Sequence, residues 1–284
     1  MIITLPRPIA LKPKKTLSIF PLGDIQSDQQ LDRLIELVEW SQERLNEGVS
    51  VLCYGTGDYY ETTSPSERVK LAGANLHDST YETLNKSNME QADNFIEIMK
   101  PLKGKVISLL KGHHSAQLRF EIKKKGEQTT AVVKDSEEYI AEKLGAEYAG
   151  DGVQLIDMMI AGCLFRIMTM HGYGSARTEG ARVMKRMRMN AVIGNCHWYA
   201  MAHDNDKVSY PKEPLFVSET KRGEIYYLKQ YFTGCGSFQE SYLVGNLAAG
   251  YAEKLALPPS ALGVVIMSIR YNEKKMRLDY HISN

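Results

Sequence analysis

The sequence SVLCYGTGDYYE, residues 50–61, is the most informative stretch of this chain. Its apolar first half predicts a short buried strand, which ends in a tight loop at Gly55 and Gly57. Asp58 follows at the carboxyl end of that strand, where open α/β sheets place their sites. Glycines in such a loop let the backbone approach an ion or a phosphate closely. A Gly-Asp pair after one strand is also typical of an ordinary turn, so its meaning depends on the rest of the chain.

A strand and a helix are predicted before this stretch. Residues 17–22 form an apolar run that predicts the first core strand, which ends at Gly23 and Asp24. Apolar residues then recur at helical spacing over residues 31–45. The order strand, helix, strand predicts a βαβ unit with two parallel strands and a right-handed crossover.

Length and composition limit the class of protein. With 284 residues, 43% of them hydrophobic, the chain can bury a large core. We expect a single domain over residues 1–284, with a Pro- and Lys-containing lead-in segment at residues 1–15. The net charge of +1 gives no global attraction to polyanions, so any nucleic-acid surface must be local.

The cysteines and the hydropathy predict a cytoplasmic protein. The four cysteines are scattered without a C-x-x-C pair, which argues against a zinc ribbon and a disulfide framework. Reduced thiols are typical of the cytosol. We find neither an apolar run of the roughly 18 residues that a membrane helix needs nor the core of a signal peptide, so we expect no membrane contact.

Apolar patterns locate the other elements. They predict helices at 89–99, 136–144 and 181–189, and a strand or hairpin excursion at 117–134 with an exposed tip at 123–125. They predict strands at 105–110, 153–159, 163–170, 191–193, 215–217, 225–232, 263–271 and 276–282. Together these patterns predict an α/β (α+β) domain of two packed mixed β-sheets flanked by helices.

Five predicted strand ends carry residues that can bind a divalent metal. Each alone is typical of a hydrogen-bonded surface residue, but five in sequence, nearly all beside a glycine, indicate a shared site. These residues are Asp24 with Gln26, Asp58, His113 with His114, His171, and Asn195 with His197.

The order of these motifs resembles the calcineurin-like metallophosphoesterase superfamily, in particular its phage and bacterial members. The family pattern is Asp-x-His, Gly-Asp-x-x-Asp, Gly-Asn-His-Asp/Glu, a lone His, and Gly-His-x-His. The corresponding residues here are Asp24-Ile25-Gln26, Gly57-Asp58-Tyr59-Tyr60-Glu61, Gly112-His113-His114-Ser115, His171-Gly172 and Gly194-Asn195-Cys196-His197. The resemblance covers nearly the whole chain and implies a four-layer αββα sandwich.

The resemblance also implies a site for two divalent metal ions. The first ion would be held by Asp24, Gln26, Asp58 and His197. The second would be held by Asp58, His113, His171 and Asn195. Asp58 would bridge the two ions, and the unligated His114 would protonate the leaving group. Two such ions, about 3.5–4 Å apart, clamp a phosphate and turn a bridging water into hydroxide.

Departures from the family pattern bear on the choice of metal. His113 stands where the family has asparagine and Asn195 where it has histidine, so the second ion keeps its set of donors. Gln26 replaces a histidine, and its amide oxygen favours Mn²⁺ over Zn²⁺. We therefore expect Mn²⁺ first, with Fe, Zn, Mg or Ni as alternatives. Ser115 replaces the acid that usually follows the catalytic histidine.

Two groups of residues near the site could contact substrate. Arg177, Arg186 and Arg188 are candidates for binding phosphate, although a basic run at 182–188 is equally typical of a solvated helix face. Five aromatic residues adjoin site residues and could stack on nucleic-acid bases or pack at the mouth of the site; we favour packing for most of them. They are Tyr59, Tyr60, Tyr173, Trp198 and Tyr199.

The sequence therefore predicts metal-dependent hydrolysis of phosphate esters, by a phosphodiesterase or nuclease. Nucleic acid is a candidate partner, and the host cytoplasm is the expected location if the chain is phage-encoded. Two alternatives remain open: a metal-depleted interaction protein on the same scaffold, and a phosphomonoesterase of a small metabolite. One fold can host all three functions.

Overall fold

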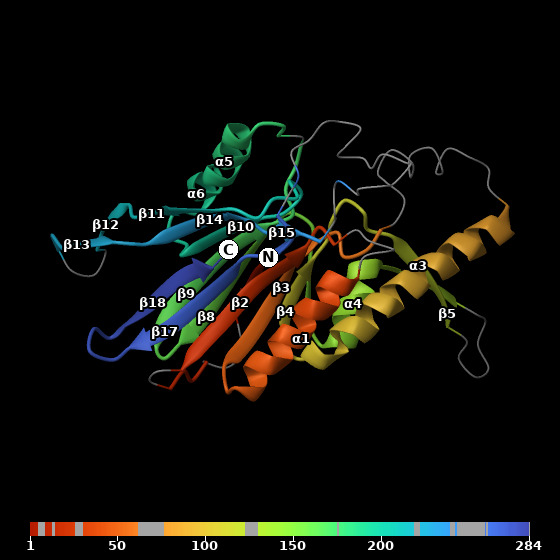
Figure 1. Ribbon diagram of the computed structural model, residues 1–284. Helices are drawn as coiled ribbons and strands as arrows, with labels where there is room; N and C mark the ends of the chain where they lie inside the picture. Colours follow the sequence, from red (N-terminus) through yellow and green to blue (C-terminus); the bar gives the residue numbers. More distant parts are fainter. Residues whose placement is uncertain are drawn as a thin grey trace.

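Two six-stranded mixed sheets form the centre of the molecule (Figure 1). The computed structural model describes residues 1–4, 9–12, 15–25, 31–61, 77–122, 130–174, 176–218, 222–238, 242, 259 and 261–283. The first sheet has the order β18-β17-β2-β3-β4-β7 and the second the order β1-β8-β9-β10-β14-β11. Mixed sheets combined with helices confirm the predicted α/β class.

In the first sheet, β2, β3, β4 and β7 run parallel, and β17 and β18 are antiparallel additions beside β2. Its strands are β2 (Thr16–Gly23), β3 (Ser50–Gly57), β4 (Val106–Leu110), β7 (Glu147–Gly150), β17 (Ile266–Asn272) and β18 (Arg277–Ser283). The parallel pairing of β2 with β3 across α1 confirms the predicted βαβ unit. It also brings the carboxyl ends of β2, β3 and β4 to one edge.

In the second sheet, β9, β10 and β14 run parallel to one another. Its strands are β1 (Ile2–Thr4), β8 (Val153–Ile160), β9 (Cys163–Met170), β10 (Trp198–Met201), β11 (Ser209–Lys212) and β14 (Gln230–Gly234). Strands β8 and β9 form the predicted antiparallel pair, joined at Ala161 and Gly162, which both have positive φ.

Three small antiparallel pairs lie outside the two sheets. They are β5 (Gln117–Ile122) with β6 (Thr130–Asp135), β12 (Leu215–Val217) with β13 (Ile225–Tyr227), and β15 (Gly236–Ser237) with β16 (Gly263–Val264). The first pair is the predicted hairpin excursion; its tip at 123–125 lies outside the described residues. The predicted strand at 225–232 divides into β13 and β14, because the chain leaves the small pair and enters the second sheet.

Helices cover the outer faces of the sheets (Figure 1). They are α1 (Asp32–Asn46), α3 (Asp78–Met99), the 3-10 helix η1 (Lys100–Leu102), α4 (Ser136–Leu144), α5 (Glu179–Met187) and α6 (Met189–Val192). Within the described part of the chain, no helix is both long and apolar enough to cross a membrane. The predicted strand at 191–193 is instead the end of α6. The next strand, β10, begins later in the chain, so different residues follow its carboxyl end than the sequence predicted.

The described core has three apolar clusters: one between the sheets, one under α1, α3 and α4, and a smaller one that includes Met168 of β9 and Met189 of α6. Tyr54 of β3 packs edge-on against Trp198 of β10, with ring centroids 5.6 Å apart. On the other face of the first sheet, Phe20 of β2 belongs to a cluster with Leu34 of α1 and Phe95 of α3. Burying each such side chain stabilises the fold by about 1.5–3 kcal/mol. Because both faces of the parallel strands are buried, these strands read as continuous apolar runs in the sequence.

Candidate metal centre

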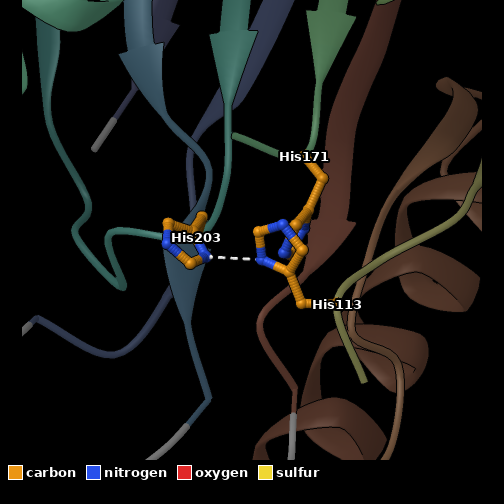
Figure 2. Close-up of side chains that lie close together, drawn as sticks. All are labelled: His113, His171 and His203. Carbon is orange, nitrogen blue, oxygen red and sulfur yellow. Dashed lines mark hydrogen bonds between the residues drawn. The ribbon is translucent and has the colours of Figure 1, made fainter. Parts of the chain in front are cut away.

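Five strand ends meet at one place between the two sheets. Asp24, Asp58 and His113 follow β2, β3 and β4 of the first sheet, while His171 and His203 follow β9 and β10 of the second. Potential ligand atoms of His113, His171 and His203 all lie within 4.8 Å of one another, and so do those of Asp24, Asp58 and His171. The three imidazole rings converge from separate loops (Figure 2). This geometry is suited to holding a divalent cation.

His113 and His203 face each other across the site. Their Nδ1 atoms lie 3.1 Å apart and their rings are nearly perpendicular, at 84°. Nε2 of His203 lies 2.5 Å from the carbonyl oxygen of Gly174, which can only accept, so Nε2 carries the proton. Burial lowers the pKa of His203, which keeps the ring neutral and leaves Nδ1 as an electron-pair donor toward the site.

His171 is oriented in the same way through its other nitrogen. Its Nδ1 donates to the carbonyl oxygen of Thr56 at 2.8 Å, which directs Nε2 toward Oδ2 of Asp58 at 3.2 Å. Metal-binding histidines typically make such a contact from the non-ligating nitrogen to a backbone carbonyl. Burial lowers the pKa of His171, but the hydrogen bond and charge of Asp58 and the charge of Asp24 raise it to about 9.

Asp58 links the loop that carries His114 to the potential metal ligands. Its Oδ1 accepts the backbone N–H of His114 at 2.8 Å, while Oδ2 faces His171. Burial raises its pKa, but the hydrogen bond and charge of His171 lower it well below the usual range of an aspartate. A Cβ atom at Gly112 would lie 2.0 Å from Oδ1 of Asp58, so only glycine fits there. Asp58 is therefore a buried, ionised carboxylate in contact with two of the predicted site residues.

Asp24 is a buried carboxylate whose oxygens lack hydrogen bonds of normal geometry from the described residues. It is 1% exposed, and in the part of the chain that the structure describes neither carboxyl oxygen has a hydrogen-bond partner of normal geometry. Burial and the charge of Asp58 raise its pKa to about 7, although His171 and the backbone N–H groups of His203 and Asn205 lower it. Burying an unpaired carboxylate is costly, and a cation would offset that cost. The donor set therefore fits a divalent metal.

Backbone conformation separates this place from the rest of the chain. Asp24, Asp58, His203 and Asn205 have φ angles of 51°, 56°, 70° and 50°. They are four of the six non-glycine residues with positive φ in the described ranges. Such conformations cost about 1–3 kcal/mol each and persist where the surrounding structure holds them, which is typical of functional sites.

His114 lies beside the cluster and contacts a carboxylate. Its Nδ1 lies 3.3 Å from Oε1 of Glu61, and its side chain is 18% exposed. The adjacent Ser115 donates from its hydroxyl to Oε2 of the buried Glu137 at 2.6 Å, which anchors the loop on α4. Among the described residues, His114 belongs to neither group of potential ligands.

Two predicted ligands lie elsewhere. Asn195 and His197 precede β10, and Nδ1 of His197 accepts the backbone N–H of Arg166 at 3.0 Å. His197 also stacks on Phe165, and it lies four residues before the last residue of β10, roughly 13 Å along the strand. The structure thus does not bring these two residues to Asp58, and Gln26 lies outside the described residues.

His203 is the site residue that sequence analysis missed. It follows the apolar run Trp198–Met201, which is the strand that pairs in parallel with β9. In that register Met201 lies beside Met170, so the residues that follow the two strands emerge together. The signal was the apolar sequence at 198–202, which His203 follows directly. The Gly-Asn-Cys-His sequence at 194–197 resembled the family motif more closely, so the prediction named Asn195 and His197 instead.

The predicted substrate contacts also need correction. Arg186 is fully buried and pairs with Asp204 at 3.4 Å and, more closely, with Asp206. It is therefore a core ion pair rather than a surface contact for phosphate. Arg177 and Arg188 are exposed. Of the aromatic residues near the site, only Tyr173 is exposed; Tyr59, Tyr60, Trp198 and Tyr199 are buried, which confirms packing for these four.

Comparison with known proteins gives little further guidance. No protein-family model matches the chain, and no curated protein matches it. Twelve chains of solved structures match, including one titled "GAP50 the anchor in the inner membrane complex of Plasmodium". That chain is 11% identical, with a TM-score of 0.31 over 95% of this chain and 84% of the other. A similarity this weak carries no argument about function.

Proposed function

We propose that this protein is a metal-dependent phosphoesterase of the calcineurin-like type, on a four-layer αββα scaffold. The observation that supports the proposal best is the convergence of His113, His171, His203 and Asp58 beside Asp24, whose buried carboxylate has no hydrogen-bond partner of normal geometry among the described residues. The face-to-face packing of the two sheets, with helices outside, agrees with such a scaffold. The substrates we propose are phosphodiesters, including nucleic acid.

The residues divide into two groups of ligands. His113, His171 and His203 offer imidazole nitrogens, which suit Zn, Fe or Ni ions. Asp24 and Asp58 offer carboxylate oxygens, which suit Mn²⁺ and Mg²⁺. We propose two divalent ions, with Mn²⁺ as the first candidate because the carboxylate oxygens of Asp24 and Asp58 suit it. When bound, such ions neutralise phosphate charge and supply hydroxide at neutral pH.

The chain itself supplies the proton for the leaving group in this proposal. Oε1 of Glu61 lies beside Nδ1 of His114, so we assign Nε2 as the atom that donates to the departing oxygen. The His114 backbone N–H on Asp58 keeps this ring next to the carboxylate that would hold the metal. A cleft of about 200 Å³ is lined in part by His113 and His171. We place the protein in the cytoplasm, in line with its free cysteines.

The test combines metal analysis with kinetics. Protein purified without chelator should hold divalent metal, and Mn²⁺ should activate hydrolysis of bis-p-nitrophenyl phosphate. Comparing this diester with p-nitrophenyl phosphate and with single-stranded DNA separates diesterase, monoesterase and nuclease activities. A chain that binds no metal, even with added Mn²⁺, would instead be an interaction protein on this scaffold.

A further inference from the structure

A buried lysine joins the two loops that carry His171 and His203. Nζ of Lys185, on α5, donates to the carbonyl oxygen of Tyr173 at 3.1 Å and to Oδ1 of Asp204 at 2.6 Å. Tyr173 lies two residues after His171, and Asp204 directly follows His203. The Lys185 side chain is only 8% exposed and that of Asp204 only 3% exposed. One ammonium group thus contacts both loops from inside the protein.

The two loops also touch each other directly. Nε2 of His203 donates to the carbonyl oxygen of Gly174. A Cβ atom at Gly172 would lie 2.8 Å from Cβ of His203, so the loops are packed as closely as glycine allows. Any movement of Tyr173 or Asp204 would therefore change the position of a histidine ring.

The loop that carries His203 needs such an anchor. His203 and Asn205, on either side of Asp204, both have positive φ, at 70° and 50°. Non-glycine residues hold such conformations only when the surroundings fix them. Within the described chain, the carboxylate of Asp204 accepts hydrogen bonds from Nζ of Lys185 and, at 3.4 Å, from Nη2 of Arg186. The contact with Lys185 is the shorter of the two and the one that also reaches the His171 loop.

We propose that Lys185 is a positioning residue of the metal centre, which sets the spacing of the His171 and His203 rings by tying Tyr173 to Asp204. This inference rests on the proposed function, because it assumes that the two histidines bind metal. It assigns the buried charge at this position on α5 to site geometry rather than to phosphate binding. Contacts of this outer kind typically change metal affinity by about 10–100-fold when lost.

The experiment compares Co²⁺ binding by the intact chain and by Lys185→Met, which keeps most of the length of the side chain and removes its charge. Co²⁺ is titrated into metal-free protein, and its visible absorption reports both affinity and ligand geometry. We expect Lys185→Met to bind Co²⁺ about 10–100-fold more weakly and with an altered spectrum. Lys103→Met, which removes an exposed lysine beyond η1, is the matched control and should match the unmodified chain.

The outcomes separate this inference from the proposed function. If the unmodified chain binds no Co²⁺, the metal centre itself is wrong. If it binds Co²⁺ and a folded Lys185→Met variant binds with the same affinity and spectrum, only the positioning role is overturned. Circular dichroism of metal-free protein checks folding. If Lys185→Met does not fold, Asp204→Asn replaces it, because that change removes the charge at the other end of the contact and preserves shape; the same two results then decide.

Discussion

His113 and His203 come from different sheets, yet their Nδ1 atoms lie 3.1 Å apart. His113 follows β4 and His203 follows β10, so about 90 residues separate the two rings in sequence. Packing of the two sheets through Tyr54 and Trp198 fixes this approach. A metal bound here would therefore crosslink the two sheets, and its binding should depend on residues from both.

The first prediction contrasts two histidines that flank the same strand. His203→Ala should weaken metal binding by more than about 100-fold, because losing even an outer partner of a ligand costs about 10–100-fold. His197→Ala, at the other end of β10, should leave metal content unchanged because its ring stacks on Phe165 outside the site. Metal analysis of both variants after dialysis against a weak chelator checks this. If His197→Ala loses metal and His203→Ala does not, then His197 is a ligand, as the sequence predicted, and His203 is not.

This contrast shows what the sequence could and could not predict. Asp24, Asp58, His113 and His171 were identifiable because each follows a clear apolar run, and the structure brings all four together. His203 was missed because β10 is only four residues long and follows a helix end that reads as a strand. The register between β9 and β10 determines which residues after β10 lie beside His171. That register depends on how strands distant in sequence pair and pack, so a local sequence pattern does not show it.

The side chains of the basic run were misjudged for a related reason. The sequence allowed this run either to bind phosphate or to form a solvated helix face, but Lys185 and Arg186 are buried while Met184 is 56% exposed. Asp204 and Asp206 compensate the buried charges, and they lie about 20 residues further along the chain. The pattern of residues in a helix does not show whether carboxylates distant along the chain will form ion pairs with its lysine and arginine side chains. By contrast, α4 and the β8–β9 pair have the predicted bounds within a residue, because local turn and cap residues determine them.

The second prediction concerns Asp58. Asp58→Asn should abolish hydrolysis of bis-p-nitrophenyl phosphate, because the charged ligand shared by both groups of donors is lost. The amide would also replace one acceptor oxygen of Asp58 by an NH₂ group, which can only donate. That group would face either the backbone N–H of His114 or the ring of His171, where an acceptor oxygen now lies. The measurement is steady-state turnover with Mn²⁺ in excess, with the exposed Asp32→Asn as control. Full activity in Asp58→Asn would remove this residue from the centre of the mechanism.

The third prediction concerns stability. Arg186→Met should destabilise the fold by about 3–5 kcal/mol, because it leaves Asp204 and Asp206 buried with one fewer partner. Arg188→Met, two residues further along and exposed, should change the free energy of unfolding by less than about 0.5 kcal/mol. Urea denaturation of metal-free protein measures both. Equal stabilities would show that Arg186 reaches solvent and is available to substrate after all.

The fourth prediction separates proton transfer from metal binding. His114→Ala should retain metal, because His114 lies in neither group of ligand atoms, and should lose about 10²–10⁴ in turnover, the usual contribution of a general acid. The loss should be smaller for p-nitrophenyl esters, whose leaving group needs little protonation, than for alkyl or nucleotide esters. His113→Ala, one residue earlier, is the matched control and should instead lose metal.

Glu61 provides an independent check on the same proton. Because its Oε1 lies 3.3 Å from Nδ1 of His114, Glu61→Gln should slow alkyl esters more than p-nitrophenyl esters, in the same direction as His114→Ala but to a smaller degree. Parallel metal analysis and kinetics on the three variants, with both types of leaving group, complete the test. If His114→Ala loses metal while His113→Ala keeps it, the two neighbouring histidines have exchanged roles, and the proton must come from His113 or from a metal-bound water.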